Sequence, residues 1–277
     1  MKNHVPLLAI LSFLFFSCYS QNNEQEISSN DSSAVKTIML KPIEPQETAK
    51  YPSVKSIPVP KSYKRVDIKP GSFGEYLRNL ELKTENNKVY LHTGELKWNQ
   101  TAQYAVLKID VGTRDLQQCA DAVMRLRGEY LFAQKQYSNI HFNFLSDGKP
   151  RYYKDYAKGD LSHKKFRKYM DYIFSYANTA SLKNELTKVN SINDIQIGDV
   201  FIQKGRPYGH AITVMDVAKN ESGEIIFMLS QSYMPAQDIH ILKNPNNENL
   251  SPWYKVNSNG ILITPEWSFK YEDLMRF

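Results

Sequence analysis

The sequence predicts an α+β fold in which helices come first and pack on an antiparallel sheet. Hydrophobic residues make up 42 % of the 277 residues, as in a globular chain. Apolar residues at helical spacing mark the segment "SHKKFRKYMDYIFSYA". Beyond residue 190, runs of strand-forming residues alternate with turns rich in Gly, Asn and Pro. Helices followed by consecutive strands are typical of α+β domains.

The expected elements follow in chain order. Ser72 begins a short helix, and "KVYLH" and "QYAVLKIDV" alternate as strands do. A helix is expected over "DLQQCADAVMRLRGEYL", a strand in "IHFNFLSDG", a helix capped by Ser162, and a short helix in "SLKNELTKV". The remaining strands form an antiparallel meander with a hairpin turn from Asn220 to Gly223, namely "IQIGDVFIQKG", "YGHAITVMDVAKNESG", "EIIFMLSQSYMPAQ" and "DIHILKN".

The N-terminus has the pattern of an export signal. A basic start precedes an apolar run from Val5 to Phe16, which is too short to span a bilayer as a helix. The run ends in "FFSC" and resembles a bacterial lipoprotein signal, which implies that Cys18 is lipidated; the alternative is an ordinary secretory signal. We expect a signal peptide over 1–17, a polar and proline-rich tether over 18–61, and one domain over 62–277. The protein is then exported and anchored by lipid, with the outer membrane as the expected location.

Composition and motifs exclude several classes of function. The net charge is +6, but no dense run of Lys and Arg is present, so no nucleic-acid partner is expected. A Gly-rich phosphate loop, HExxH, CxxC and EF-hand patterns are all missing, so no cofactor is expected. No metal is expected either, because metal-ligand spacing is not found among His92, His141, His163, His210 and His240.

Cys119 is the second of only two cysteines. If Cys18 carries lipid, Cys119 has no partner in its own chain and is an inert buried thiol, half of an intermolecular disulfide, or a nucleophile. Asp115 and Gln118 are spaced as a capping box, which places Cys119 in the first turn of a helix. The positive end of the helix dipole and its free N–H groups would favour the thiolate.

A histidine and a glutamine downstream supply what a nucleophilic thiol needs. His210 follows Gly209 at the start of a predicted strand and can act as general base, although a lone histidine is more often a satisfied core residue. The next strand returns antiparallel and carries Gln231, which we expect to orient the imidazole. Asp216 lies roughly 20 Å along the strand from His210 and is the weaker choice. Further residues expected at the oxyanion or substrate-lining positions are Gln118, Asp121, Tyr233, Gln237 and His240.

A helix-borne "QCAD", then "GDVF…GHA", then a polar residue on the next strand resembles the Cys-His-polar order of papain-like hydrolases of the NlpC and CHAP type. The resemblance implies a papain-like fold in which "FAQKQYSNI…SLKNELTKVNSI" is a helical insertion, with Cys119, His210 and Gln231 as catalytic residues. The chain also resembles an uncharacterised family of bacterial lipoproteins, through "QSYMPAQDIHILKNP", "SPWY" and "TPEW".

The expected function is that of an exported thiol hydrolase, an amidase or peptidase acting on an amide or ester of the cell envelope. Peptidoglycan peptides are the first substrate to test. The alternatives are a papain-like module that binds cell-wall or glycan fragments without turnover, and an interaction module of an envelope complex.

Overall fold

A computed structural model describes residues 50–277; the predicted signal peptide, Cys18 and most of the predicted tether lie outside the described residues. The helices are α1 (Phe73–Asn79), α2 (Cys119–Ala133), α3 (Tyr153–Ala157), α4 (His163–Tyr176) and α5 (Thr179–Glu185). None of the helices in this part of the chain has the length and apolar character needed to cross a membrane.

The strands of the main sheet are β1 (Tyr63–Arg65), β2 (Gln103–Val106), β5 (Thr187–Lys188), β6 (Val200–Gln203), β7 (His210–Asn220), β8 (Ile225–Gln231), β9 (His240–Leu242), β10 (Trp253–Lys255) and β13 (Leu274–Arg276). Two small hairpins stand apart from it, formed by β3 (His141–Asn143) with β4 (Pro150–Tyr152) and by β11 (Ile261–Ile263) with β12 (Ser268–Lys270).

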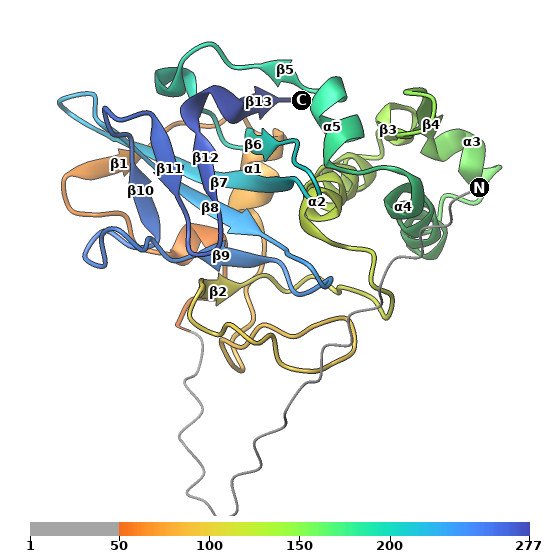
Figure 1. The fold of residues 1–277 in the computed structure, drawn as a ribbon, viewed down its shortest axis with the longest axis horizontal. Helices are drawn as coiled ribbons and strands as arrows, with labels where there is room; N and C mark the ends of the chain where they lie inside the picture. The colour runs from red at the N-terminus through yellow and green to blue at the C-terminus, as the bar shows by residue number, and fades with distance from the viewer. Residues whose placement is uncertain (1–49) are drawn as a thin grey trace, which may run out of the picture. The chain divides into compact units, whose positions relative to one another are not determined.

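The main sheet is antiparallel and has the order β2-β9-β8-β7-β6-β13-β5, with β1 paired to the distal part of β7 and β10 paired to β8 (Figure 1). The run β6-β7-β8-β9 is the predicted meander, and Gly223 closes the predicted turn by donating its N–H to the carbonyl of Asn220. The chain is therefore a mixed α and β protein built around a large antiparallel sheet, as the element order predicts.

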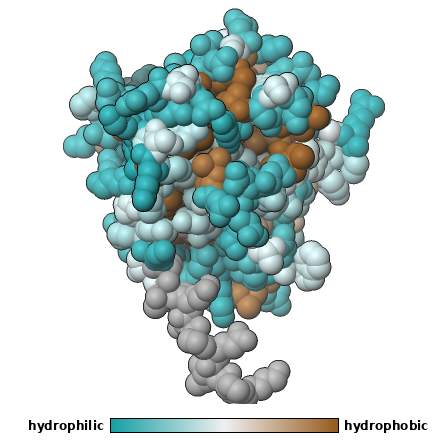
Figure 2. All heavy atoms as spheres, turned by 90° about the vertical axis from the view of Figure 1, so that its left-hand side faces the viewer, coloured by the Kyte–Doolittle hydropathy of each residue, from teal (hydrophilic) through white to brown (hydrophobic). Residues whose placement is uncertain are grey.

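Alternate residues of β6 point to different layers of the core. Val200 and Ile202 pack with Cys119 and the other apolar residues of α2, whereas Phe201 packs with Ile212 and Phe269. Helix α2 thus covers one face of the sheet, and the β11–β12 hairpin covers the other (Figure 1). The outer surface seen in Figure 2 is mostly hydrophilic, with apolar residues showing between polar ones.

The helical region between α2 and β5 contains the predicted helix capped by Ser162, whereas the helix predicted over "SLKNELTKV" ends at Glu185 and gives way to strand β5. Ser162 caps α4 by accepting the N–H of Lys165. The predicted apolar face of α4 is fully buried and contains Phe166, Tyr169, Met170 and Ile173. This region adds α3, α4, α5 and the β3–β4 hairpin beside α2, and the end of α4 and the start of α5 contribute to the cleft described below.

Two local expectations differ from the structure. "KVYLH" forms no strand, only isolated bridges at Tyr90 and Leu91. Two backbone N–H groups that would pair with a neighbouring strand donate to side chains instead. The N–H of Val89 donates to the Gln100 side chain, and the N–H of Tyr90 donates to the Asp238 carboxylate. The second difference concerns the start of the folded part. Val54 and Ile57 are fully buried, so packed residues extend upstream of Ser62.

Candidate functional site

Helix α2 begins at Cys119 itself. Gln118 is the N-cap residue, with extended backbone angles, and its N–H donates to Oδ2 of Asp121 at 3.1 Å. The predicted cap by Asp115 is wrong, because Asp115 lies in a turn and the helix starts four residues later, after Gln118. Cys119 is therefore the first helical residue, closer to the helix terminus than the capping-box pattern predicts.

Asp115 and its neighbours tie the start of α2 to the connection between β8 and β9. Oδ1 of Asp115 accepts the backbone N–H of Ala236 at 2.7 Å and Nε2 of Gln118 at 3.0 Å. The hydroxyl of Ser232 lies 2.9 Å from the carbonyl oxygen of Gln117. These contacts link segments more than 100 residues apart in sequence, and so fix where Cys119 sits relative to the end of the sheet.

Cys119 lines a cleft of about 590 Å³. The cleft lies between the start of α2, the α4–α5 junction and the loop that joins β6 to β7. Only 6 % of the residue is exposed, and its Sγ lies 3.9 Å from Oγ1 of Thr179 and 3.9 Å from the carbonyl oxygen of Gly209. The thiol is thus at the floor of the cleft, where it also contacts the apolar core.

The thiol is not activated in the resting structure. Burial raises the pKa of Cys119, and the nearby Asp121 carboxylate raises it further; the Thr179 hydroxyl and two backbone N–H groups offset this only in part. The N–H of Ala120 in the first turn of α2 lowers the pKa, as expected of a helix terminus, but desolvation outweighs it. Burial also raises the pKa of Asp121 well above the usual range of a carboxyl.

His210 is the first residue of β7, and a chain of hydrogen bonds determines its tautomer. Nε2 of Gln231 donates to Oε2 of Glu266 at 2.6 Å, which leaves Oε1 of Gln231 as the group facing Nε2 of His210 at 3.0 Å. An amide oxygen only accepts, so His210 carries its proton on Nε2. Nδ1 then has a free lone pair and can accept a proton. The predicted proximity of Gln231 to His210 is confirmed.

Glu266 is the residue that sequence reasoning missed. It lies on the connection between β11 and β12, where Lys97 Nζ contacts Oε2 at 2.5 Å and Asn99 Nδ2 donates to Oε1 at 3.1 Å. The chain Lys97–Glu266–Gln231–His210 joins two loops and the two strands β7 and β8. In the sequence, Glu266 lies in the short stretch "TPEW". This stretch has neither helical nor strand periodicity, so it does not indicate that Glu266 contacts the sheet.

Aromatic rings enclose the imidazole of His210. The ring centroid lies 5.0 Å from that of Tyr233, 5.2 Å from Trp267 and 5.8 Å from Phe269. Burial in this apolar pocket lowers the pKa of His210 to about 4, although the Gln231 hydrogen bond and the Glu266 charge act in the opposite direction. At neutral pH the ring is therefore uncharged and can act as a base.

Cys119 and His210 meet around the end of β7. The sulfur touches the carbonyl of Gly209, and the N–H of Ala211 also faces the thiol, so Sγ contacts the backbone on both sides of His210. Within residues 50–277, no hydrogen bond joins Sγ to the imidazole. The thiol lies on the α2 side of β7, whereas the His210 ring packs against Trp267 and Phe269 of the hairpin, so the sulfur contacts the backbone next to His210 and the predicted hydrogen bond to the ring is not seen in the described part of the chain.

The residues predicted to line the substrate site separate into two groups. Gln118 and Asp121 line the cleft with Cys119. Tyr233 packs on the His210 ring and is half-buried. Gln237 and His240 are enclosed and do not line the cleft: burial lowers the pKa of His240 to about 3, and its Nδ1 lies 2.9 Å from the carbonyl of Asp238. Asp216, the weaker choice to orient His210, is instead bound by Arg65 and Arg78.

Gly209 is required by a close backbone contact. A Cβ on this residue would lie 2.3 Å from the carbonyl oxygen of Gln203 and 3.0 Å from Cγ2 of Thr179. We expect Gly209→Ala to lower the free energy of unfolding by about 1–3 kcal/mol, as other overpacked sites do. Denaturant unfolding followed by circular dichroism measures this. An unchanged unfolding midpoint would show that β6 and β7 can separate at this point without cost.

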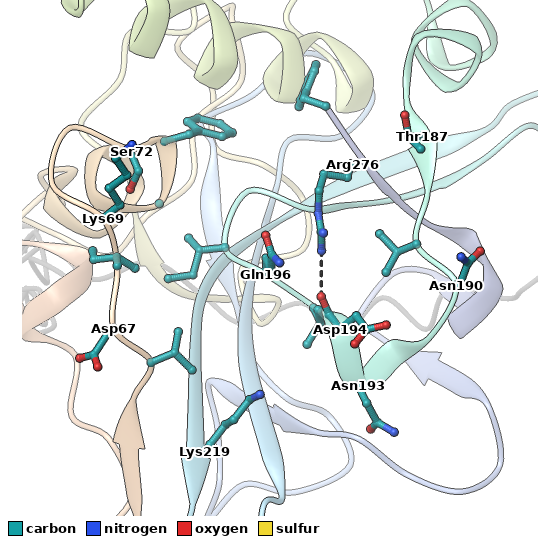
Figure 3. Close-up of a pocket in the computed structure, with 18 of the residues that line it drawn as sticks. Asp67, Lys69, Ser72, Thr187, Asn190, Asn193, Asp194, Gln196, Lys219 and Arg276 are labelled. Carbon is teal, nitrogen blue, oxygen red and sulfur yellow. Dashed lines mark hydrogen bonds between the residues drawn. The ribbon is translucent and has the colours of Figure 1, made fainter.

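A larger hollow of about 1030 Å³ lies elsewhere, between α1 and the segment that joins β5 to β6 (Figure 3). Its lining includes Asp67, Lys69, Lys219 and Arg276. Arg276 is already engaged, because it pairs with Asp199 and donates to the carbonyl of Asp194, as the dashed line in Figure 3 marks. The lining contains no cysteine or histidine, so the smaller cleft at Cys119 is the candidate for chemistry.

Comparison with protein families gives one match. The model of the family described as "Domain of unknown function (4846)" matches residues 54–276, most of the chain, and the chain therefore belongs to that family. Comparison with the curated proteins and with the solved structures gives no match.

Proposed function

We propose that this member of a family of unknown function is a cysteine hydrolase of amides or esters, with Cys119 as nucleophile, His210 as general base and Gln231 as the residue that positions the imidazole. The observation that carries the proposal is the chain Lys97–Glu266–Gln231–His210, which fixes the Nε2–H tautomer and leaves Nδ1 as acceptor, on a residue whose preceding carbonyl lies 3.9 Å from the Cys119 sulfur.

The proposed reaction has two halves. In the first, Nδ1 of His210 takes the thiol proton as Sγ forms a bond to the carbonyl carbon. The C–N or C–O bond then breaks, and the leaving amine or alcohol takes the proton back from Nδ1, which leaves a thioester on Cys119. In the second, His210 activates water in the same way, the S–C bond breaks, and the acid product and free thiol are restored.

The start of α2 supplies a donor for the developing oxyanion. The N–H of Cys119 is one of the first four of the helix, which have no partner within it, and it donates to no acceptor among the described residues. A negative oxygen formed beside the sulfur would accept this N–H. The side chain of Gln118 is held by Asp115 at 3.0 Å and forms the adjacent rim of the cleft.

The N-terminal sequence supports the cell envelope as the place of action. The pattern that resembles a lipoprotein signal makes an exported, lipid-anchored protein at the outer membrane part of the proposal, and peptides of the cell wall its first substrates. A second candidate is a module of papain-like fold that binds such fragments without turnover. The observation that favours it is the buried, protonated thiol, whose pKa is raised.

Trapping of an acyl-enzyme separates the two functions. With p-nitrophenyl acetate, we expect one acetyl group on Cys119, detected by intact mass spectrometry and located by peptide mapping, which distinguishes Cys119 from Cys18. Cys119→Ala removes the label, and Cys119→Ser slows it strongly. If the native protein releases no burst of p-nitrophenol and Cys119 stays unmodified, the hydrolase proposal is wrong and the binding module remains.

A further inference from the structure

The loop between β6 and β7 presents two cations to the cleft. Lys204 and Arg206 both line it and are both exposed. The loop is tightly folded here, because a Cβ on Gly205 would lie 1.7 Å from the carbonyl oxygen of Tyr208. Within residues 50–277, neither cation is within ion-pair distance of a carboxylate, and neither donates a hydrogen bond.

The acidic groups of the same cleft are held by other contacts. Oδ1 of Asp115 accepts the N–H of Ala236 and the side-chain amide of Gln118. Asp121 is 8 % exposed, its Oδ2 accepts the N–H of Gln118, and burial raises its pKa well above the usual range. The cleft therefore presents two exposed cations against one exposed carboxylate, that of Asp115, and within residues 50–277 neither cation is paired with it.

From this imbalance we infer that the cleft selects acyl donors that carry a carboxylate close to the bond under attack, and that Lys204 and Arg206 bind that carboxylate. The inference rests on the proposed function, because it names the substrate class of the same site. The guanidinium of Arg206 can bind a carboxylate through two parallel hydrogen bonds, and Lys204 adds a second charge two residues away. Cys119 lines the same cleft, so the anionic group and the reacting carbonyl would belong to one short ligand.

A matched pair of activated esters tests the inference. Mono-p-nitrophenyl succinate carries a free carboxylate, and p-nitrophenyl methyl succinate has the same chain with that carboxylate methylated. We expect the wild-type protein to be acylated about tenfold faster, in terms of kcat/KM, by the charged ester, the gain typical of one charge-assisted contact. Lys204→Gln with Arg206→Gln should abolish the preference, so that the two esters acylate the variant at equal rates.

A control variant separates local binding from net charge. Lys69→Gln with Lys219→Gln removes the same two charges from the larger hollow, away from the cleft, and should keep the tenfold preference. The preference should also fall as sodium chloride is raised, because the contacts are at an exposed rim. Equal acylation by the two esters, or a preference that the double variant retains, would overturn the inference while leaving the hydrolase proposal intact.

A binding experiment on a variant without the thiol distinguishes failure of the carboxylate-binding inference from failure of the hydrolase proposal. In the full chain with Cys119→Ser, NMR titration compares the peptides acetyl-Ala-Glu-Ala-amide and acetyl-Ala-Gln-Ala-amide. Tighter binding of the Glu peptide, lost on Lys204→Gln with Arg206→Gln, supports the inference even if no acyl-enzyme forms, in which case only the hydrolase proposal falls. Equal binding of the two peptides contradicts the inference whether or not Cys119 is acylated.

Discussion

Replacing His210 with alanine is expected to slow acylation of Cys119 by about 10²–10⁴-fold, the usual contribution of a general base. The buried thiol has a raised pKa and cannot ionise by itself near neutral pH, so it depends on Nδ1 of His210 to take its proton. Burst kinetics with p-nitrophenyl acetate measure the acylation rate directly. His163→Ala is the matched control, because that histidine is exposed and pairs with Glu129 away from the cleft.

The pH dependence of acylation follows from the lowered pKa of His210. Below about pH 4 the ring is protonated and cannot act as base, so the rate should rise with a midpoint near 4 and be level by about pH 6. An unburied histidine would place this midpoint near 6.5. Circular dichroism at each pH controls for unfolding. A midpoint near 6.5 in a folded protein would mean that the ring is not enclosed by Tyr233, Trp267 and Phe269.

The largest loss of stability is expected from Asp216→Ala. Asp216 is fully buried on β7, where its two carboxylate oxygens bind Arg65 of β1 at 2.6 Å and Arg78 of α1 at 2.7 Å. Without it, Arg78 remains 9 % exposed and unpaired within the core. Removal of one partner of a buried ion pair typically costs about 3–5 kcal/mol, because the other charge stays desolvated.

Denaturant unfolding of the full chain measures this difference. The control is Glu81→Ala, which removes an equivalent carboxylate from an exposed pair with Lys108 and should leave the unfolding midpoint almost unchanged. If both variants behave alike, Asp216 does not hold α1 and β1 on the sheet. A lower midpoint for Asp216→Ala together with an unchanged acylation rate in the native protein would place Asp216 outside the chemistry, as its distance from His210 along β7 predicts.

Local patterns in the sequence predict the sheet and part of the site. The meander over residues 195–244 can be predicted because each strand is followed by a turn signal, and strands joined by short turns pair with each other. The same logic places Gln231 beside His210, since one hairpin joins them. The apolar spacing of α4 and its Ser162 cap are likewise contained in one short window of sequence.

The parts that could not be predicted depend on contacts between distant segments. Glu266 and Lys97 come from irregular loops 169 residues apart, and no spacing rule links them. The start of α2 moved from Asp115 to Gln118 because Ala236, far along the chain, takes up the Asp115 carboxylate. The net direction of the Cys119 pKa could not be predicted, because a helix terminus is visible in the sequence, whereas the burial that outweighs it is a property of the assembled core.

The position of β13 has a consequence for a chain that is truncated at its C-terminus. This strand, Leu274–Arg276, is inserted between β6 and β5, and Glu266 precedes it by only a few residues. The second edge of β6, which leads into the cleft loop, and the contact that holds Gln231 against His210 therefore need residues 266–276, which lie far downstream of both in the sequence. A chain truncated before Glu266 would keep Cys119 and His210 but would lose the hydrogen bond that fixes the Gln231 amide and, with it, the tautomer of the imidazole.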